Sequence, residues 1–300
     1  MTGRADGRDA ATEPPDRAPD AAVVVVNYES GPALLSCVEG WQAEGPRQLV
    51  VVDNGSTDGA VGQLSRRHPD VEILVTGRNL GYGAAANRGV AATTAPGVVV
   101  CNPDLEVRPG ALDTLVGALR DEPAFALVGP LIRDAAGRRY PSARRFPSMV
   151  DAAGHAVLGI FAPGNRFTRR YQQADLSADS GPDRGVDWVS GACFAVRRSA
   201  FEQVGGFDEA YFMYAEDVDL CWRLGRQGWR IGYVTRAEVV HLQGVSTDRM
   251  PYRMIAEHHR SLFRFAVRSN RGWRRALLPL VALGLGVRAT LACLARASGH

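Results

Sequence analysis

Two carboxylates in the first half of the chain follow apolar runs at positions suited to ligand binding. Asp53 follows the run at residues 48–52, and Asp104 closes an Asn-Pro-Asp turn after the run at residues 97–101. In open α/β sheets, ligands bind in the crevice beyond the carboxyl ends of the strands. Asp104 is therefore suited to hold a divalent metal ion against a phosphorylated ligand, and Asp53 to accept hydrogen bonds from a ribose or a base. A plain β-turn explains the Asn-Pro-Asp sequence equally well.

A second group of acids, Glu216, Asp217 and Asp219, opens a predicted helix that Gly228 closes. Carboxylates are favoured in the first turn of any helix, which is enough to explain their presence. Residues two apart on a helix do not share a face, so Asp217 and Asp219 should point in different directions. At most one pair can serve one site. A single positioned carboxylate suffices as the general base for an attacking hydroxyl.

The small residues at positions 81–86 form an apparent dinucleotide fingerprint, Gly81-x-Gly83-x-x-Ala86. That fingerprint belongs after the first strand of a dinucleotide-binding fold, whereas here it follows the third predicted strand, at residues 71–75. The mismatch argues against a nucleotide-dependent oxidoreductase. The close approach of a helix N-terminus to a diphosphate would also account for the small residues.

The elements that must position these side chains alternate between strand and helix. Apolar runs at residues 21–26, 48–52, 71–75, 97–101 and 125–128 predict strands, with predicted helices at residues 32–41 and 109–120. This order predicts an α/β fold with a mostly parallel central sheet flanked by helices. Residues 133–186 have no clear pattern, and such insertions often form substrate loops.

The composition is that of a globular protein: 300 residues, 46% hydrophobic and 22% charged. The five cysteines are scattered, without CxxC pairs or zinc spacing, so a reducing cytoplasmic location fits. Residues 1–20 predict a disordered tail. A globular domain is expected over residues 21–250.

Residues 251–300 predict basic, amphipathic helices that form a membrane-associating extension. Arg260, Arg264 and Arg268 are spaced four apart, so they line one helical face that could meet phosphates or simply face solvent. Residues 276–287 are apolar but are followed by Arg288, which leaves them short of the roughly 20 residues of a spanning helix. We therefore expect a helix that lies on an anionic membrane surface, at the inner face of the plasma membrane, and no nucleic-acid partner.

The motifs VVVDNGSTDG, NLGYGAAANRG, CNPD and FDEAYFMYAEDVDLCWR occur in this order, with a Ser-Gly-Ala segment before the last. With them, residues 21–248 resemble the inverting glycosyltransferases of family 2, which have the GT-A fold, and within these the bacterial rhamnosyltransferases that act on lipid-linked cell-wall precursors. The resemblance implies a divalent cofactor, Mg²⁺ or Mn²⁺, held by Asp104 and His241. A histidine after an apolar strand is also a common core residue.

The resemblance also implies roles for the other motif residues. Asp217 would be the catalytic base. The nucleotide sugar would be bound by Tyr28, Asp53, Asn79, Gly81, Asn102 and Asp104. The acceptor would be bound by Trp188, Gly191, Ala192 and Glu216. Glu29 stands where relatives more often have Asn, which leaves its role open.

The expected reaction is transfer of L-rhamnose from dTDP-rhamnose to a polyprenyl-diphosphate-linked sugar. The sequence leaves three alternatives open. One is transfer of galactofuranose or glucose from a UDP-sugar to a glycan or lipid. The others are the nucleotide-dependent oxidoreductase and a membrane scaffold that keeps the fold without catalysis. The presence of Asp53, Asp104 and Asp217 together argues against the scaffold.

Overall fold

A computed structural model describes residues 20–146, 166, 184–242 and 251–297. The expected N-terminal tail, apart from Asp20, lies outside this part, as does most of the unpatterned insertion. The strands are β1 (Ala21–Asn27), β2 (Gln48–Asp53), β3 (Glu72–Val75), β4 (Gly97–Cys101), β5 (Leu105–Val107), β6 (Phe125–Asp134), β7 (Ala143–Arg144), β8 (Arg184–Val186), β9 (Trp188–Val189), β10 (Cys193–Arg197) and β11 (Arg230–His241). The helices are α1 (Ala33–Ala43), α2 (Ala60–Arg67), α3 (Tyr82–Ala92), α4 (Ala111–Asp121), α7 (Arg198–Gln203), α8 (Glu216–Arg226), α9 (Pro251–Ser269) and α10 (Leu278–Ala297).

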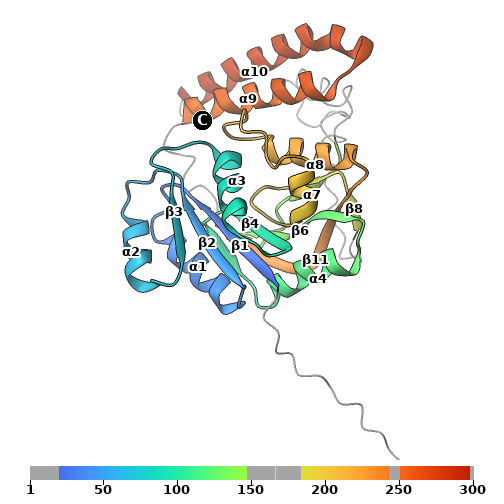
Figure 1. Cartoon of the computed structure of the whole chain (residues 1–300). Helices are drawn as coiled ribbons and strands as arrows, with labels where there is room; N and C mark the ends of the chain where they lie inside the picture. Colours follow the sequence, from blue (N-terminus) through green and yellow to red (C-terminus); the bar gives the residue numbers. More distant parts are fainter. Residues whose placement is uncertain (1–19, 147–165, 167–183, 243–250, 298–300) are drawn as a thin grey trace, which may run out of the picture.

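The described residues form a nine-stranded sheet in the order β3-β2-β1-β4-β10-β6-β11-β5, with β8 also paired to β11 (Figure 1). Strands β3, β2, β1, β4, β6 and β11 run in one direction. Strand β10 runs against them because it pairs antiparallel with both β4 and β6. The expected α/β fold is confirmed, and the sheet is mixed, with β5, β8 and β10 as its antiparallel members.

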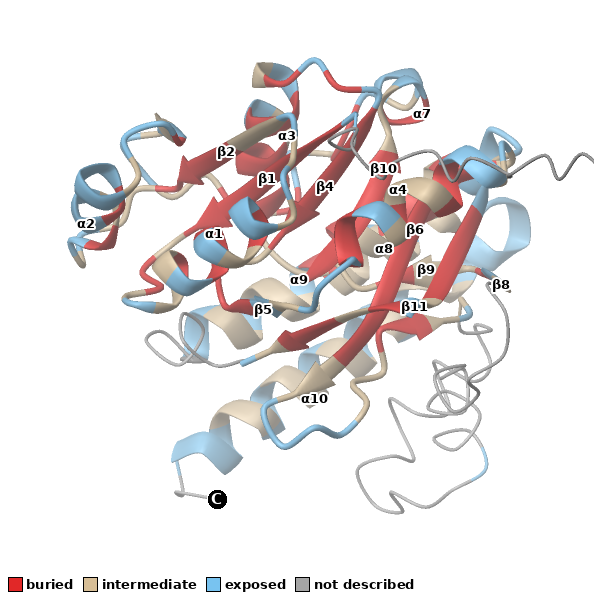
Figure 2. Ribbon diagram, turned by 90° about the horizontal axis from the view of Figure 1, so that it is seen from below, coloured by how far each residue is buried: buried red, intermediate tan, exposed pale blue. Residues whose placement is uncertain are grey.

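Strand β1 shows why the sheet is covered on both faces. All seven of its residues are buried, and successive side chains point to opposite faces. Val23 and Val25 pack in one core with α1, α2 and α4, whereas Val24 and Val26 pack in a second core with α3, α7 and α8. A β-branched run without polar alternation is typical of such a strand. Figure 2 shows the buried strands between the two helical layers.

The small residues of α3 are explained by packing. A Cβ on Gly81 would lie 2.3 Å from the carbonyl oxygen of Phe212, and one on Gly83 would lie 2.9 Å from the Cβ of Phe207. Gly81 also has a φ of +92°, which side chains rarely adopt. The apparent fingerprint therefore lets α3 approach the Phe207–Phe212 segment, and β3, which precedes it, is the edge strand of the sheet rather than a central one.

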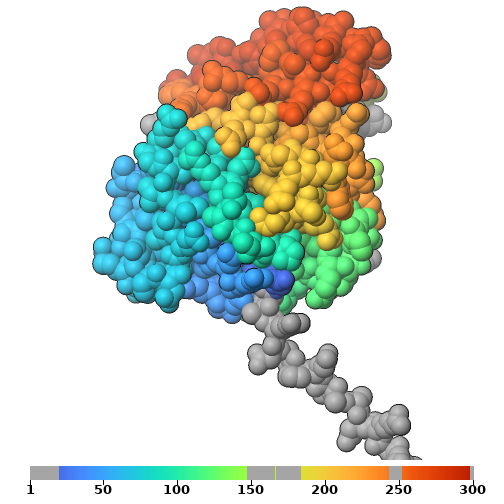
Figure 3. Space-filling view, viewed as in Figure 1, coloured from blue at the N-terminus to red at the C-terminus, as the bar shows by residue number. Residues whose placement is uncertain are grey.

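The C-terminal extension differs from its expected form. Helix α10 is continuous from Leu278 to Ala297, and Arg288 lies inside it without ending it. The 3-10 helix η2 (Gly272–Leu277) directly precedes it. Together they form a helical segment of 26 residues whose length and apolar composition would allow it to cross a membrane. The length argument for a helix too short to span is therefore wrong. Helices α9 and α10 lie side by side across one end of the molecule (Figures 1 and 3).

Candidate functional site

The predicted site residues gather at the carboxyl-terminal ends of the parallel strands. Because β1, β2, β4 and β11 run in the same direction, Asn27, Asp53, the turn after Cys101 and His241 all lie where their strands end. Strand β10 runs the other way, so its first residues meet the end of β4. The backbone N–H of Asn102 donates to the carbonyl of Ala192 at 2.9 Å. Segments distant in sequence thus come together beyond the carboxyl ends of the strands, where α/β sheets bind ligands.

Asp53 is held at the end of β2 with its carboxylate in a fixed position. It is buried, and its Oδ1 accepts a hydrogen bond from the side-chain amide of Asn27 at 3.0 Å. The backbone N–H of Ser56 donates to both carboxylate oxygens at 3.3 to 3.4 Å. Tyr28, which is partly exposed, directly follows Asn27, the partner of Asp53 in the sheet.

Glu29 has a structural explanation. Its Oε1 accepts hydrogen bonds from the backbone N–H of Thr57 at 2.7 Å and from the Thr57 hydroxyl at 2.9 Å. Its own N–H donates to the hydroxyl of Ser56 at 3.0 Å. The acid therefore ties the loop after β1 to the loop that follows Asp53.

Asn79 and Gly81 belong to a hydrogen-bonded turn before α3. The Oδ1 of Asn79 accepts from the N–H of Gly81 at 2.9 Å and from the amide of Asn54 at 3.1 Å. The next N–H, that of Tyr82, donates to the carbonyl of Phe212 at 3.1 Å. Through these contacts both residues shape the loop beside Asp53.

Asp104 and His241, 137 positions apart in the sequence, are neighbours in the fold. The Oδ1 of Asp104 lies 3.1 Å from the Nε2 of His241, and the amide of Asn102 lies 3.3 Å from the same nitrogen. Their juxtaposition follows from the pairing of β5 with β11, which sets Leu105 opposite His241. Carboxylate oxygens and imidazole nitrogens are both common ligands of divalent ions. Asp104 and His241 could therefore hold such an ion, which would supply positive charge beside a diphosphate.

Asp217 lies in the first turn of α8. Its Oδ2 accepts a hydrogen bond from the backbone N–H of Gly191 at 2.8 Å, and its Oδ1 accepts one from the N–H of Val218 at 2.8 Å. Burial raises the pKa of Asp217, whereas these N–H donors and the charge of Arg144 oppose the increase.

Its neighbour Glu216 differs in environment. Burial, and then the charge of Asp217, raise the pKa of Glu216 to about 8. One of its carboxylate oxygens, Oε2, is buried without a hydrogen-bond partner among the described residues. The raised pKa of Glu216 favours its protonated form at neutral pH, whereas the backbone N–H donors favour the charged form of Asp217.

Gly191 and Ala192 connect the two parts of the site through their backbone. The N–H of Gly191 holds Asp217, and its carbonyl accepts a hydrogen bond from the Tyr82 hydroxyl at 2.6 Å. The carbonyl of Ala192 holds Asn102, which contacts His241. A Cβ on Gly191 would lie 3.3 Å from the Cβ of Asp217, so a larger residue there would push against the carboxylate.

Trp188, predicted to bind the acceptor, lies in β9 beside two residues that the sequence did not single out. Its indole N–H donates to the carbonyl of Arg145 at 3.3 Å, and the guanidinium of Arg144 lies 5.4 Å from the centre of its ring. Arg144 comes from the unpatterned insertion, where nothing in the sequence marked it. Tyr82, whose hydroxyl donates to the carbonyl of Gly191, was also not predicted as a site residue, although it lies within the glycine-rich motif.

Asp219 points away from this site, as its spacing from Asp217 predicted. It is fully buried and forms ion pairs with Arg223 at 2.6 Å and with Arg268 of α9 at 3.2 Å. Arg264 and Arg268 also pair with Asp208. Neither alternative that the sequence left open for this stripe, phosphate contact or a solvated face, describes these two arginines, since they pair with acids of the domain. Arg260 is largely exposed.

The backbone just before Glu216 is strained. Tyr214 and Ala215 have φ values of 68° and 61°, in the left-handed region that favours glycine. Each such residue costs about 1–3 kcal/mol and persists where surrounding contacts hold it, often at functional sites.

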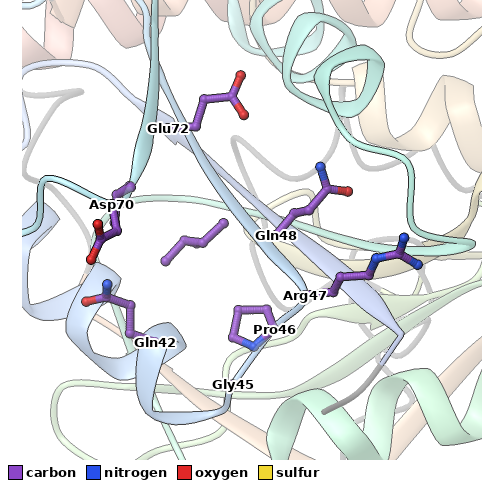
Figure 4. A pocket seen from close by; sticks show the side chains of 9 residues that line it. Gln42, Gly45, Pro46, Arg47, Gln48, Asp70 and Glu72 are labelled. Carbon is purple, nitrogen blue, oxygen red and sulfur yellow. The ribbon is translucent and has the colours of Figure 1, made fainter. Parts of the chain in front are cut away.

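A separate pocket of about 420 Å³ lies at the opposite ends of the strands from the predicted site (Figure 4). Its lining includes Gln42 from the end of α1, Gln48 from the start of β2 and Glu72 from the start of β3. These are the amino ends of the strands. The position of this pocket separates it from the carboxylates and the histidine described above.

Comparison with solved structures agrees with the fold. A mannosyltransferase from Pyrobaculum calidifontis, solved with GDP-Man and Mn²⁺, aligns with a TM-score of 0.54 at 20% identity, over 95% of this chain and 77% of its own. GalNAc-T7, solved with UDP, GalNAc and Mn²⁺, aligns with a TM-score of 0.56 at 16% identity, over 74% of this chain and 44% of its own. These similarities support the GT-A type of fold.

Comparison of sequences is more specific. An N-acetylglucosaminyl-diphospho-decaprenol L-rhamnosyltransferase of Mycobacterium tuberculosis is 45% identical over 269 residues, which cover 85% of this chain and 87% of that protein. The rhamnosyltransferase WbbL of Escherichia coli is 26% identical over 265 residues, covering 84% and 96%. The profile described as glycosyltransferase like family 2 matches residues 19–275, and the chain is a glycosyltransferase that belongs to this family.

Proposed function

We propose that this chain transfers L-rhamnose from dTDP-rhamnose, with inversion, to N-acetylglucosamine carried on a polyprenyl diphosphate. The observation that carries the proposal is the single backbone segment, Gly191–Ala192, that links the candidate base Asp217 to the candidate metal ligands Asp104 and His241. The identity to a rhamnosyltransferase named for a diphospho-decaprenol acceptor supports the choice of sugar and acceptor.

The chemistry follows from this arrangement. A divalent ion at Asp104 and His241, when bound, supplies positive charge that stabilises the leaving nucleoside diphosphate. Asp217 accepts the proton of the acceptor hydroxyl, whose oxygen forms a bond to the anomeric carbon as the bond from that carbon to the diphosphate breaks. Because attack and departure occur on opposite faces in one displacement, the configuration inverts. The N–H groups of Gly191 and Val218 orient the carboxylate of Asp217 and favour its charged form, and the raised pKa of Glu216 favours its protonated form.

The proposal also includes the membrane. Helix α10 exposes Leu280, Leu283 and Leu294, and the exposed Arg271, Arg274 and Arg275 precede it. Basic residues beside an apolar helix favour an anionic surface. Because α10 lies along α9 and carries Arg288 within its length, we favour a helix lying in the interface at the cytoplasmic face over one that spans.

Replacing Asp217 by Asn tests the reaction. We expect turnover with dTDP-rhamnose and a polyprenyl-diphosphate acceptor to fall by about 10²- to 10⁴-fold, the usual contribution of a general base. Donor affinity should stay within about twofold, because Asp53 and Asp104 lie on other elements. The exposed Asp121 gives the matched control, Asp121→Asn, with unchanged turnover.

Two results would contradict parts of this proposal. Unchanged turnover in Asp217→Asn would remove this residue as the base. Turnover of a UDP-sugar in place of dTDP-rhamnose would keep the mechanism and replace the donor.

Removal of the metal tests Asp104. A ligand that binds the folded state raises the unfolding midpoint, so dTDP-rhamnose with Mn²⁺ should stabilise the wild-type chain. We expect EDTA to remove most of this stabilisation, and Asp104→Asn to reduce it even with Mn²⁺ present. A donor-induced shift that EDTA leaves unchanged would argue against a metal at Asp104 and His241.

The proton on Glu216 gives a pH dependence of stability. Between the ordinary pKa of 4.5 and the raised value of about 8, the folded chain binds more protons than the unfolded chain, so this residue makes stability fall as pH rises. Glu216→Gln removes that loss. Its unfolding midpoint should match the wild type at pH 5 and exceed it increasingly up to pH 8, whereas Glu202→Gln, a change at an exposed helix position, should follow the wild type at every pH.

Removal of the residues after Arg275 tests the membrane association. We expect the shortened chain to move to the soluble fraction of cells and to lose binding to vesicles that contain anionic lipids. The full chain should be released from membranes by alkaline carbonate. Membrane binding that survives the truncation would exclude α10 as the anchor, and resistance to carbonate would favour a spanning helix.

A further inference from the structure

Residues 212–219, which include Glu216 and Asp217, are called the catalytic segment below. Helix α9 contacts this segment on both sides of these two acids. On the N-terminal side, the hydroxyl of Ser261 donates to the carbonyl of Met213 at 2.8 Å. On the C-terminal side, the Nε of Arg268 lies 3.2 Å from the Oδ1 of Asp219. Ser261 is 3% exposed and Asp219 is fully buried, so each contact has one buried partner.

The N-terminal contact is placed next to the strained backbone. Met213 immediately precedes Tyr214 and Ala215, the two residues with positive φ. Tyr214 is also met by α9, since its ring lies 5.1 Å from the ring of His258. A left-handed conformation in residues other than glycine persists only where the surroundings hold it, and α9 supplies two of the contacts that do so.

Helix α3 holds the same segment from its other side. The carbonyl of Phe212 accepts the hydrogen bond from Tyr82, and the guanidinium of Arg253, from α9, lies 4.6 Å from the centre of the Phe212 ring. In Figure 3 the yellow part of the chain, to which this segment belongs, lies beside the teal part that includes α3 and below the orange and red C-terminal helices. The base is thus carried on a short stretch of backbone clamped between an element of the domain and an element of the C-terminal extension.

We infer that Ser261 and Arg268 are positioning residues for Asp217, and that α9 holds the catalytic segment in its working geometry. This inference rests on the proposed role of Asp217 as the base. Among the described residues, Ser261 and Arg268 have no contact with the Asn-Pro-Asp turn that carries Asp104 or with Asp53. Neither should therefore affect how the donor binds. A displacement of about 1 Å at a reacting group can cost about 10²-fold in rate, which gives α9 a large effect on turnover without any contact with the substrate.

The chain offers matched controls on the same helix. Ser269 is also a partly buried serine of α9, but its hydroxyl donates to the carbonyl of Phe265 within the helix at 2.7 Å. Arg260 is 76% exposed and pairs with Glu257 of the same helix. Ser261→Ala is therefore compared with Ser269→Ala, and Arg268→Gln with Arg260→Gln.

We expect Ser261→Ala and Arg268→Gln each to lower kcat by about 10-fold or more, with the KM for dTDP-rhamnose unchanged within about twofold. The two control variants should keep wild-type values of both constants. The amount of folded enzyme is taken from the stoichiometry of donor binding in calorimetric titration, so a loss of folded protein is not mistaken for a loss of turnover. Arg268→Lys, which keeps the charge opposite Asp219, should recover part of the rate.

A double-mutant cycle separates positioning from general stabilisation. If Ser261 acts through Asp217, then adding Ser261→Ala to the Asp217→Asn variant should lower the residual rate by no more than about twofold. Equal effects of Ser261→Ala with and without Asp217 would overturn the inference. So would wild-type kcat in both Ser261→Ala and Arg268→Gln.

Failure of the proposed function has a different signature. It would appear in the wild-type chain, as absence of transfer from dTDP-rhamnose, and the same variants would then be compared with the sugar nucleotide that the chain does use. Failure of the inference appears only as a lack of difference between the α9 variants and their controls.

Discussion

The hydrogen bond from the backbone N–H of Gly191 to the carboxylate of Asp217 is the contact on which the rest of the site depends. The same peptide segment receives the hydroxyl of Tyr82 and the N–H of Asn102. It thereby fixes Asp217, the proposed base, relative to the turn that carries Asp104. Because β10 runs antiparallel to β4, the start of one strand meets the end of the other, and this exchange of backbone hydrogen bonds becomes possible.

Burial raises the pKa of both Glu216 and Asp217, and their hydrogen bonds distinguish the two acids. Two adjacent carboxylates in a dry site cannot both ionise readily near neutral pH. Asp217 receives two backbone N–H donors, whereas Glu216 has a buried oxygen without a partner in the described part of the chain. Protonation is therefore favoured on Glu216 and negative charge on Asp217, which we propose as the base. The third acid of the helix, Asp219, faces the opposite way and joins α8 to α9 through Arg268.

The C-terminal helices combine two surfaces in one hairpin. Helix α9 turns Ser261, Arg264 and Arg268 toward the catalytic domain, where they meet backbone and carboxylates. Helix α10 packs on α9 and leaves most of its leucines exposed. The proposed membrane-facing helix is therefore one layer away from the segment that carries Asp217, the proposed base. We propose that the acceptor lipid and the catalytic carboxylate are brought to the same end of the molecule by this arrangement.

The sequence by itself determined the α/β class, the positions of most strands and the separate directions of Asp217 and Asp219. These follow from local rules: continuous β-branched runs form buried strands, and residues two apart on a helix do not share a face. Membership of the glycosyltransferase family was also predictable, because the motifs occur in a fixed order along the chain.

Tertiary structure decided what depends on contacts between distant segments. Strand order, which hydrophobic periodicity does not encode, places β10 between β4 and β6 and brings Asp104 next to His241. The docking of α9 likewise decides that Arg268 pairs with the buried Asp219. The glycines of α3 are a clear example, since their spacing matched a phosphate-binding fingerprint although they make room for Phe207 and Phe212. A glycine shows only that a side chain would not fit there, and the fold alone determines which neighbour occupies the space.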